Sequence, residues 1–225
     1  MRRAGADGPS GKSLRRRALS GQIVILNGAP RAGKSSIAAA IQESFDGPWL
    51  NLGVDAYARI TPKRLLPGIG LRPGGERPDL EAILPALYAA LYDSIAAHAR
   101  RGLNVVADVG HHDAYSKPIG ILKGCARRLE GLPVLFVGVR CPIDVILARR
   151  AAGQAGREGQ YVQASPGDPV PEPVRLWQDA VHAHGLYDLD VDTSKLSPAQ
   201  CADAIRAALA QGPGPPTAFQ RLARN

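Results

Sequence analysis

The sequence predicts an α/β fold in which helices cover both faces of a five-stranded, mostly parallel sheet. Short apolar runs alternate with segments of helical periodicity through the middle of the chain. The first run, residues 23–26, is apolar at every position, which is typical of a strand buried on both faces. A glycine-rich turn and an amphipathic helix follow it directly. This order of elements favours a single domain built on a parallel sheet.

The glycine-rich turn matches a phosphate-binding motif in full. Residues 28–35 read GAPRAGKS, which fits G-x-x-x-x-G-K-[ST] and lies between a predicted strand and a predicted helix. Its glycines allow backbone N–H groups to point at phosphate oxygens, and the following helix adds the positive end of its dipole. The lysine is expected to reach the β- and γ-phosphates, and the serine hydroxyl to bind Mg²⁺. We therefore predict ATP binding by Gly28, Ala29, Pro30, Arg31, Ala32, Gly33, Lys34, Ser35 and Ser36.

The other elements follow from the same criteria. Further strands are expected at residues 49–53, 103–109, 133–139 and 186–191. Helices are expected from residue 79 onward with a kink or a start at Pro85, from Ser116 to Leu129, from residue 142 to 150, over 174–184, and after a capping box at Ser197. Residues 61–78 are rich in Pro, Gly and basic residues, which predicts a long functional or mobile loop.

The two ends of the chain carry most of its positive charge. The net charge is +8, of which residues 1–20 contribute +5 and residues 211–225 contribute +2, leaving +1 for the rest. Their composition predicts disordered tails, a basic one at 1–20 and a second at 211–225, around a domain at 21–210. The nearly neutral domain has no aromatic–basic stripe for base stacking, which disfavours a nucleic-acid partner.

Composition also limits where the protein is expected to act. No run of eighteen apolar residues is present, and the first twenty residues lack the apolar region of a secretory signal, so we expect neither a membrane span nor export. Three widely spaced cysteines, at positions 125, 141 and 201, show no metal-ligand spacing. Reduced thiols fit the cytoplasm, and the sequence leaves open whether the chain forms a homo-oligomer.

Several polar residues come at the ends of predicted strands, where open parallel sheets bind their ligands. Asp55, Asp108 and Arg140 are in this position together with the phosphate loop, so one cleft is expected to gather them. His111 and His112 follow the third strand. Adjacent histidines point apart on an extended chain and no third ligand is evident, which disfavours a metal site. A contact in the pocket and plain loop exposure remain open for both.

The motif alone does not separate kinases from other phosphate-loop proteins. The guanine-reading Asn-Lys-x-Asp of GTPases is absent, and larger ATPases need more chain. A flexible, arginine-bearing segment after the fourth strand is typical of kinases, in which a lid closes over the transferring phosphate. We expect this lid at about residues 149–173, where Arg149, Arg150 and Arg157 neutralise charge on the γ-phosphoryl group. The alternative for each arginine is a solvated, basic helix end.

Short segments outside the phosphate loop carry a narrower signal. They read Trp-Leu at 49–50, Gly-Val-Asp at 53–55, Val-Gly-Val-Arg-Cys at 137–141, Tyr-Val at 161–162, Val-His at 181–182, Tyr-Asp at 187–188 and Val-Asp-Thr at 191–193. With the phosphate loop, they make residues 22–210 similar to chloramphenicol phosphotransferases. The resemblance implies that ATP phosphorylates a hydroxyl of the antibiotic, with Asp55 as the general base. A helix cap is the alternative role for Asp55.

The chain also departs from that family. Ala107 replaces one member of an acidic pair at the end of the third strand, which leaves Asp108 to hold Mg²⁺ through water. Residues 56–78 do not follow the family closely, although they are expected to wall the acceptor pocket. The sequence therefore favours an ATP-dependent O-phosphotransferase that inactivates a chloramphenicol-type antibiotic. A kinase of another metabolite alcohol and a nucleotide-gated nucleic-acid-binding protein are the alternatives.

Overall fold

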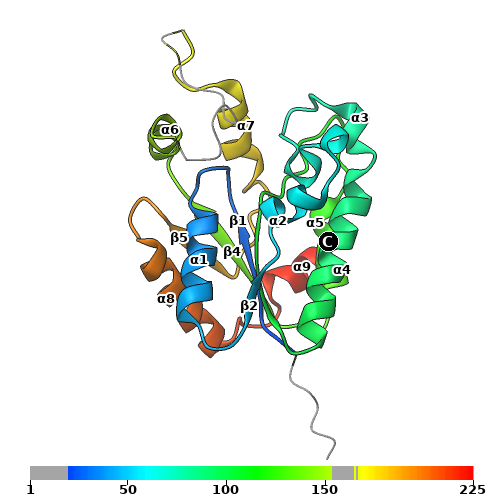
Figure 1. Ribbon diagram of the computed structural model, residues 1–225, viewed down its shortest axis with the longest axis vertical. Coiled ribbons are helices and arrows are strands. Elements are labelled where there is room, and N and C mark those ends of the chain that lie inside the picture. The colour runs from blue at the N-terminus through cyan, green and yellow to red at the C-terminus, as the bar shows by residue number, and fades with distance from the viewer. Residues whose placement is uncertain (1–19, 154–164, 166, 225) are drawn as a thin grey trace, which may run out of the picture.

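Five parallel strands form the centre of the molecule (Figure 1). The computed structural model describes residues 20–153, 165 and 167–224. The strands lie in the order β2-β3-β1-β4-β5, and every pairing is parallel. Their bounds are β1 (Ile23–Asn27), β2 (Trp49–Asn51), β3 (Asn104–Val109), β4 (Val134–Arg140) and β5 (Leu189–Asp192). The predicted α/β fold with a five-stranded parallel sheet is confirmed.

Helices cover both faces of this sheet. On one face lie α1 (Lys34–Ser44), α6 (Ile143–Ala151), α7 (Glu172–Ala180) and α8 (Pro198–Gln211). On the other lie α4 (Leu84–Arg100), α5 (Ile121–Arg128) and α9 (Ala218–Arg224). Alternate residues of β1 face opposite ways: Ile23 and Ile25 belong to one apolar core, and Val24 and Leu26 to the other. Two layers of packing therefore fix the position of β1 and of the loop that follows it.

Some boundaries differ from the predicted ones. The pattern after residue 79 divides into α3 (Pro78–Glu81) and α4, with Pro85 in the first turn of α4, so that proline starts a helix. Helix α5 begins at Ile121, five residues later than expected, because Gly120 adopts a left-handed conformation (φ 70°) just before it. The second strand ends at Asn51, two residues earlier than expected, and α2 (Val54–Ile60) follows it.

The predicted loop at 61–78 contains two short 3-10 helices, η1 (Lys63–Leu65) and η2 (Gly68–Gly70). It continues from α2, and Figure 1 shows α2 and α3 to the right of the loop that follows β1, with α6 and α7 above that loop. No helix in the described ranges is long and apolar enough to cross a membrane.

The expectation that residues 211–225 are disordered is wrong, because they contain α9. Phe219 and Leu222 of this helix are buried against α5 and the sheet. The Phe219 ring packs edge-on against the Phe136 ring, with 4.9 Å between the ring centroids. Thr217 and Gln220 form a capping box, with N–H to oxygen distances of 2.9 and 3.2 Å. The apolar spacing within this helix outweighs the Gly-Pro composition that precedes it. The other predicted tail, residues 1–19, lies outside the described residues.

Candidate active site

The phosphate loop connects β1 to α1 at the carboxyl edge of the sheet (Figure 1). Gly33 has φ 96°, a left-handed conformation that favours glycine. Gly28 is needed for a different reason: a Cβ atom there would lie 2.5 Å from the carbonyl oxygen of Val139 in β4. Ala29 and Ala32 are buried, so these two residues are placed to act through their backbone. The loop therefore has the compact form that presents amide groups to an anion.

Lys34 lies over this loop. Its Nζ atom donates hydrogen bonds to the carbonyl oxygens of Gly28 at 2.7 Å and of Ala29 at 2.9 Å. The ammonium group is therefore held at the mouth of the loop, where the motif requires it to meet the phosphates.

Ser35 and Asp108 meet at the end of the loop. The Ser35 hydroxyl donates to Asp108 Oδ2 at 2.7 Å, and the aspartate is buried. Gly53 leaves room for this carboxylate, because a Cβ at Gly53 would lie 1.6 Å from Asp108 Oδ1. A hydroxyl and a carboxylate are oxygen ligands of the kind that Mg²⁺ prefers beside phosphates and water. No group of three or more His, Cys, Asp or Glu able to hold a metal occurs within the described ranges, so the fit is to a magnesium ion that keeps water and phosphate ligands.

A cavity of about 990 Å³ brings several of the predicted site residues together. Lys34, Ser35, Asp55 and Asp108 line it, together with Arg149 and Arg150. Arg140, which was expected in the same cleft, does not line it and instead donates to Asp190 Oδ1 at 2.7 Å. Asp55 lies in the first turn of α2, whose N-cap residue is Gly53, so the structure does not use Asp55 as the helix cap. The carboxylate and the phosphate loop thus line one cavity.

The arginines of α6 differ in their surroundings. Arg149 donates from its guanidinium to Thr193 Oγ1 at 3.0 Å and to the Thr193 carbonyl at 2.8 Å, which ties α6 to the end of β5. Arg150 is 6% exposed and also lines the cavity, so it is not a solvated helix end. Arg157 lies outside the described residues, as do the other positions of 154–164 and position 166 of the predicted lid, and its role stays a prediction.

The opposite wall of the cavity consists of α2 and the segment up to residue 77. Apolar residues dominate this wall: Val54, Ala58, Leu66, Pro67, Ile69 and Leu71. Two side chains anchor it through carbonyl oxygens, with Tyr88 Oη 2.8 Å from the Ile69 oxygen and His112 Nε2 3.0 Å from the Leu71 oxygen. The Gly74 N–H also donates to the Ala114 carbonyl at 2.8 Å. The long loop is therefore a fixed wall.

Both histidines after β3 are buried, so plain loop exposure is wrong for each, and neither is among the residues that line the cavity. His112 is 4% exposed, packs against Tyr115 and Trp177, and anchors the wall through Leu71. His111 is 1% exposed, and its Nε2 lies 2.7 Å from Tyr92 Oη. Burial lowers the pKa of His112 and lowers the pKa of His111 to about 3, so both rings are neutral at pH 7.

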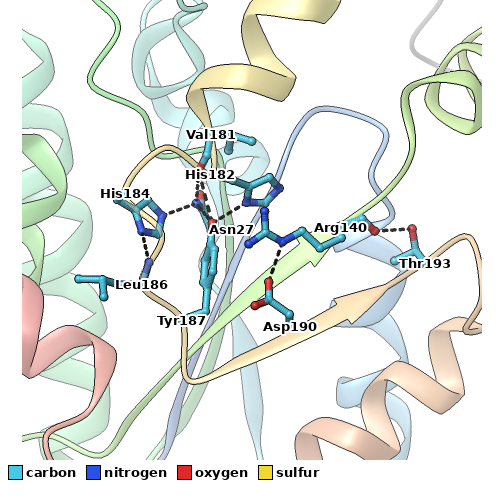
Figure 2. A network of polar contacts seen from close by, with 9 residues as sticks. All are labelled: Asn27, Arg140, Val181, His182, His184, Leu186, Tyr187, Asp190 and Thr193. Atoms are coloured by element: carbon cyan, nitrogen blue, oxygen red, sulfur yellow. Dashed lines mark hydrogen bonds and ion pairs between the residues drawn. The ribbon is translucent and has the colours of Figure 1, made fainter.

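Asn27, the last residue of β1, is the site-supporting residue that sequence reasoning missed. Its Nδ2 donates to the Val181 carbonyl at 2.9 Å and to Tyr187 Oη at 2.8 Å, and its Oδ1 accepts from the His111 N–H at 2.6 Å. Figure 2 shows Asn27 between His182, His184 and Tyr187. A polar residue that ends a fully apolar strand, immediately before the glycine loop, was the available signal. Asn27 fixes the start of that loop against two neighbouring segments.

The comparisons with known proteins agree with this geometry. Residues 21–210 match the family described as chloramphenicol phosphotransferase-like protein. The chain belongs to this family. A Mycobacterium tuberculosis protein named "Putative O-phosphotransferase" is 26% identical over 218 residues, covering 90% of this chain and 88% of the relative.

Solved structures show the same fold at lower identity. A sugar kinase from Janibacter matches with a TM-score of 0.56 and 17% identity, covering 86% of this chain and 96% of that one. The Mycobacterium tuberculosis APS kinase CysC, in complex with AMPPNP and APS, matches with a TM-score of 0.53 and 16% identity, covering 86% and 99%. These structures confirm the predicted P-loop kinase fold. The family match and the relative from Mycobacterium tuberculosis confirm the enzyme class, a small-molecule kinase.

Proposed function

We propose that this chain is an ATP-dependent O-phosphotransferase that transfers the γ-phosphate to a hydroxyl group of a small molecule. One observation carries the proposal: the phosphate loop, the Ser35–Asp108 pair and the Asp55 carboxylate all line one cavity. A nucleotide on the loop and an alcohol against the α2 wall would meet between these groups. The relative's description as an O-phosphotransferase supports the same reaction.

The loop and α1 would bind the triphosphate. Backbone N–H groups of the loop and the N-terminus of α1 hold the β-phosphate, and Lys34 turns from the carbonyls it now contacts to the β- and γ-phosphates. Ser35 would hold Mg²⁺ directly and Asp108 through water, and the ion would supply positive charge to the β- and γ-phosphate oxygens. Arg149, Arg150 and Arg157 would neutralise charge on the transferring group.

Asp55 would act on the acceptor. Its carboxylate accepts the hydroxyl proton as the acceptor oxygen bonds to the γ-phosphorus and the bond from that phosphorus to the β–γ bridging oxygen breaks, releasing ADP. Because the transition state of phosphoryl transfer is loose, much of the effect of Asp55 lies in aligning the oxygen with the phosphorus.

The acceptor pocket is the apolar wall of the cavity. A chloramphenicol-type antibiotic, named in the description of the family, is the first candidate for this wall, and its phosphorylation would inactivate it. Another metabolite alcohol is the alternative, because residues 56–78 depart from the family pattern.

The test is transfer from ATP to chloramphenicol and to a panel of hydroxyl compounds, read by the mass of the product. Asp55→Asn should lower the transfer rate by about 10²- to 10⁴-fold while leaving ATP affinity nearly unchanged. Asp144→Asn is the matched control, since Asp144 also lies in the first turn of a helix but does not line the cavity. Transfer by Asp55→Asn at the wild-type rate would show that Asp55 is not the base, and no transfer to any compound would refute the function.

A further inference from the structure

Arg72 occupies an unusual position on the acceptor wall. It follows directly after the buried Leu71, is itself half-buried, and lines the cavity that Asp55 also lines. Within the described part of the chain, the Arg72 guanidinium has neither a hydrogen bond nor an ion pair. It therefore differs from most half-buried charges, which have a partner.

Neighbouring arginines in the same cavity are engaged by the protein itself. Arg77 makes two contacts to Asp79, with Nε–Oδ1 at 2.9 Å and a terminal nitrogen to Oδ2 at 2.8 Å. Arg149 binds Thr193. Arg72 thus presents a positive charge on the acceptor side of the cavity, where the other lining residues are mostly apolar.

The acidic residues of the acceptor wall do not neutralise the charge of Arg72. Asp55 and Glu76 line the same cavity, yet no ion pair within 4.0 Å joins Arg72 to either of these residues or to any other in the described ranges. A guanidinium presents five donors in a planar fork that matches a carboxylate, phosphate or sulfate. Placing such a group in a largely apolar pocket is favourable when a ligand brings the oxyanion.

We propose that Arg72 binds an oxyanion of the acceptor, so that the acceptor is a hydroxyl compound with an apolar body and an acidic group. The hydroxyl group of the acceptor would face the Asp55 carboxylate, and its apolar body would lie against the apolar wall. Its carboxylate, phosphate or sulfate group would bind Arg72. This inference rests on the proposed function, and within that function it favours the alternative acceptor, another metabolite alcohol, over chloramphenicol, which is a neutral alcohol.

A binding experiment tests the inference without a known acceptor. The full chain is saturated with Mg²⁺ and a non-hydrolysable ATP analogue, and a library of hydroxyl compounds is screened for a rise in Tm. The library has four arms: carboxylates, phosphate esters, sulfate esters and neutral alcohols including chloramphenicol. Compounds that bind should come from an acidic arm, and the arm identifies the oxyanion. Binding confined to the neutral arm, or no binding in any acidic arm, overturns the inference.

Variants then assign the contact to Arg72. Arg72→Gln should weaken binding of the acidic compounds by at least about tenfold, and Arg72→Lys should weaken it less, because the charge stays but the fork is lost. Arg64→Gln is the control, since it removes one positive charge from the same segment at an exposed site that does not line the cavity. Acidic compounds that bind Arg72→Gln as tightly as the wild type overturn the inference.

A transfer assay separates this inference from the proposed function. For a phosphorylated acidic acceptor, Arg72→Gln should raise KM by about tenfold or more and leave kcat within about threefold, because the contact is remote from the reacting atoms. A loss of kcat at unchanged acceptor KM would instead place Arg72 on the γ-phosphate and overturn the inference. If acidic compounds bind through Arg72 but none is phosphorylated, the proposed function fails and the binding assignment stands. If a neutral alcohol is the preferred acceptor, the function stands and the assignment fails.

Discussion

The side chains of Arg31 and Arg149 each donate a hydrogen bond to the backbone carbonyl oxygen of the other residue. A terminal guanidinium nitrogen of Arg31, in the phosphate loop, donates to the carbonyl oxygens of Arg149 and of Gly153, the latter at 3.0 Å. Arg149 donates back to the Arg31 carbonyl at 3.3 Å. A cation at the last carbonyls of a helix also interacts favourably with its dipole. The phosphate loop and the C-terminal end of α6 are therefore joined by contacts in both directions.

Removing the Arg31 side chain should weaken nucleotide binding. Arg31→Ala loses the contacts to α6, and we expect the Kd for ATP to rise by about tenfold, as measured by calorimetric titration. Arg31 has φ 72°, so Arg31→Gly is the matched variant that removes the side chain but suits the backbone. It should fold at least as stably as Arg31→Ala and bind ATP equally weakly. Wild-type affinity in both variants would show that the contacts to α6 do not support the loop.

Asp108→Asn should change the magnesium requirement. The amide keeps the size of the side chain but removes the charge that faces the Ser35 hydroxyl at 2.7 Å. We expect the Mg²⁺ concentration for half-maximal transfer to rise by about 10- to 100-fold, measured by MgCl₂ titration at saturating ATP. An unchanged titration curve would mean that this carboxylate does not serve the metal.

Gly53→Ala should displace the Asp108 carboxylate. The added methyl group would fall 1.6 Å from Asp108 Oδ1, so either the strand end or the aspartate must move. We expect the free energy of unfolding in urea to fall by about 1–3 kcal/mol, together with a slower transfer rate. The control is Gly124→Ala in α5, where nothing lies within 4 Å of the new Cβ, and there the stability should hold or rise by up to about 1 kcal/mol. Equal stabilities of the two variants would contradict the crowding at Gly53.

Acid should destabilise the fold through His111. Its ordinary pKa of 6.5 falls to about 3 in the folded state, so between these values the unfolded chain binds a proton that the folded chain does not. The contribution of His111 to the free energy of unfolding is therefore fully present above pH 6.5 and is lost as the pH decreases. Between pH 7 and pH 5 this loss is about 2 kcal/mol.

The His111 prediction is measured by urea unfolding at both pH values in the wild type and in His111→Gln. The variant is expected to be less stable than the wild type at pH 7, since the contact with Tyr92 changes. Between pH 7 and pH 5, however, its free energy of unfolding should fall by about 2 kcal/mol less than that of the wild type. His182 and His184, whose pKa values burial lowers to about 4, change in the same direction and remain in both proteins. An equal pH dependence of the two proteins would contradict the assignment to His111.

The sequence alone determined the order of the strands along the chain, the parallel sheet and the phosphate loop. These depend on local patterns: apolar runs mark strands buried on both faces, and the spacing of Gly28, Gly33 and Lys34 marks the loop. The capping box at Ser197 and Gln200 is likewise local and is confirmed. Asp55 and Asp108 were proposed as site residues because strand ends meet at one edge of a parallel sheet.

Only the tertiary structure decided which polar residues are buried and what they contact. His112 anchors Leu71 from 41 residues away, and Asn27 contacts Val181 across 154 positions, so no local window contains both partners. Helix α9 is stabilised by packing on α5 and the sheet, which composition cannot reveal. The lack of a protein partner for Arg72 likewise depends on every neighbour that folding brings to the cavity. Local patterns specify the elements, whereas partners distant in sequence are fixed by how those elements pack.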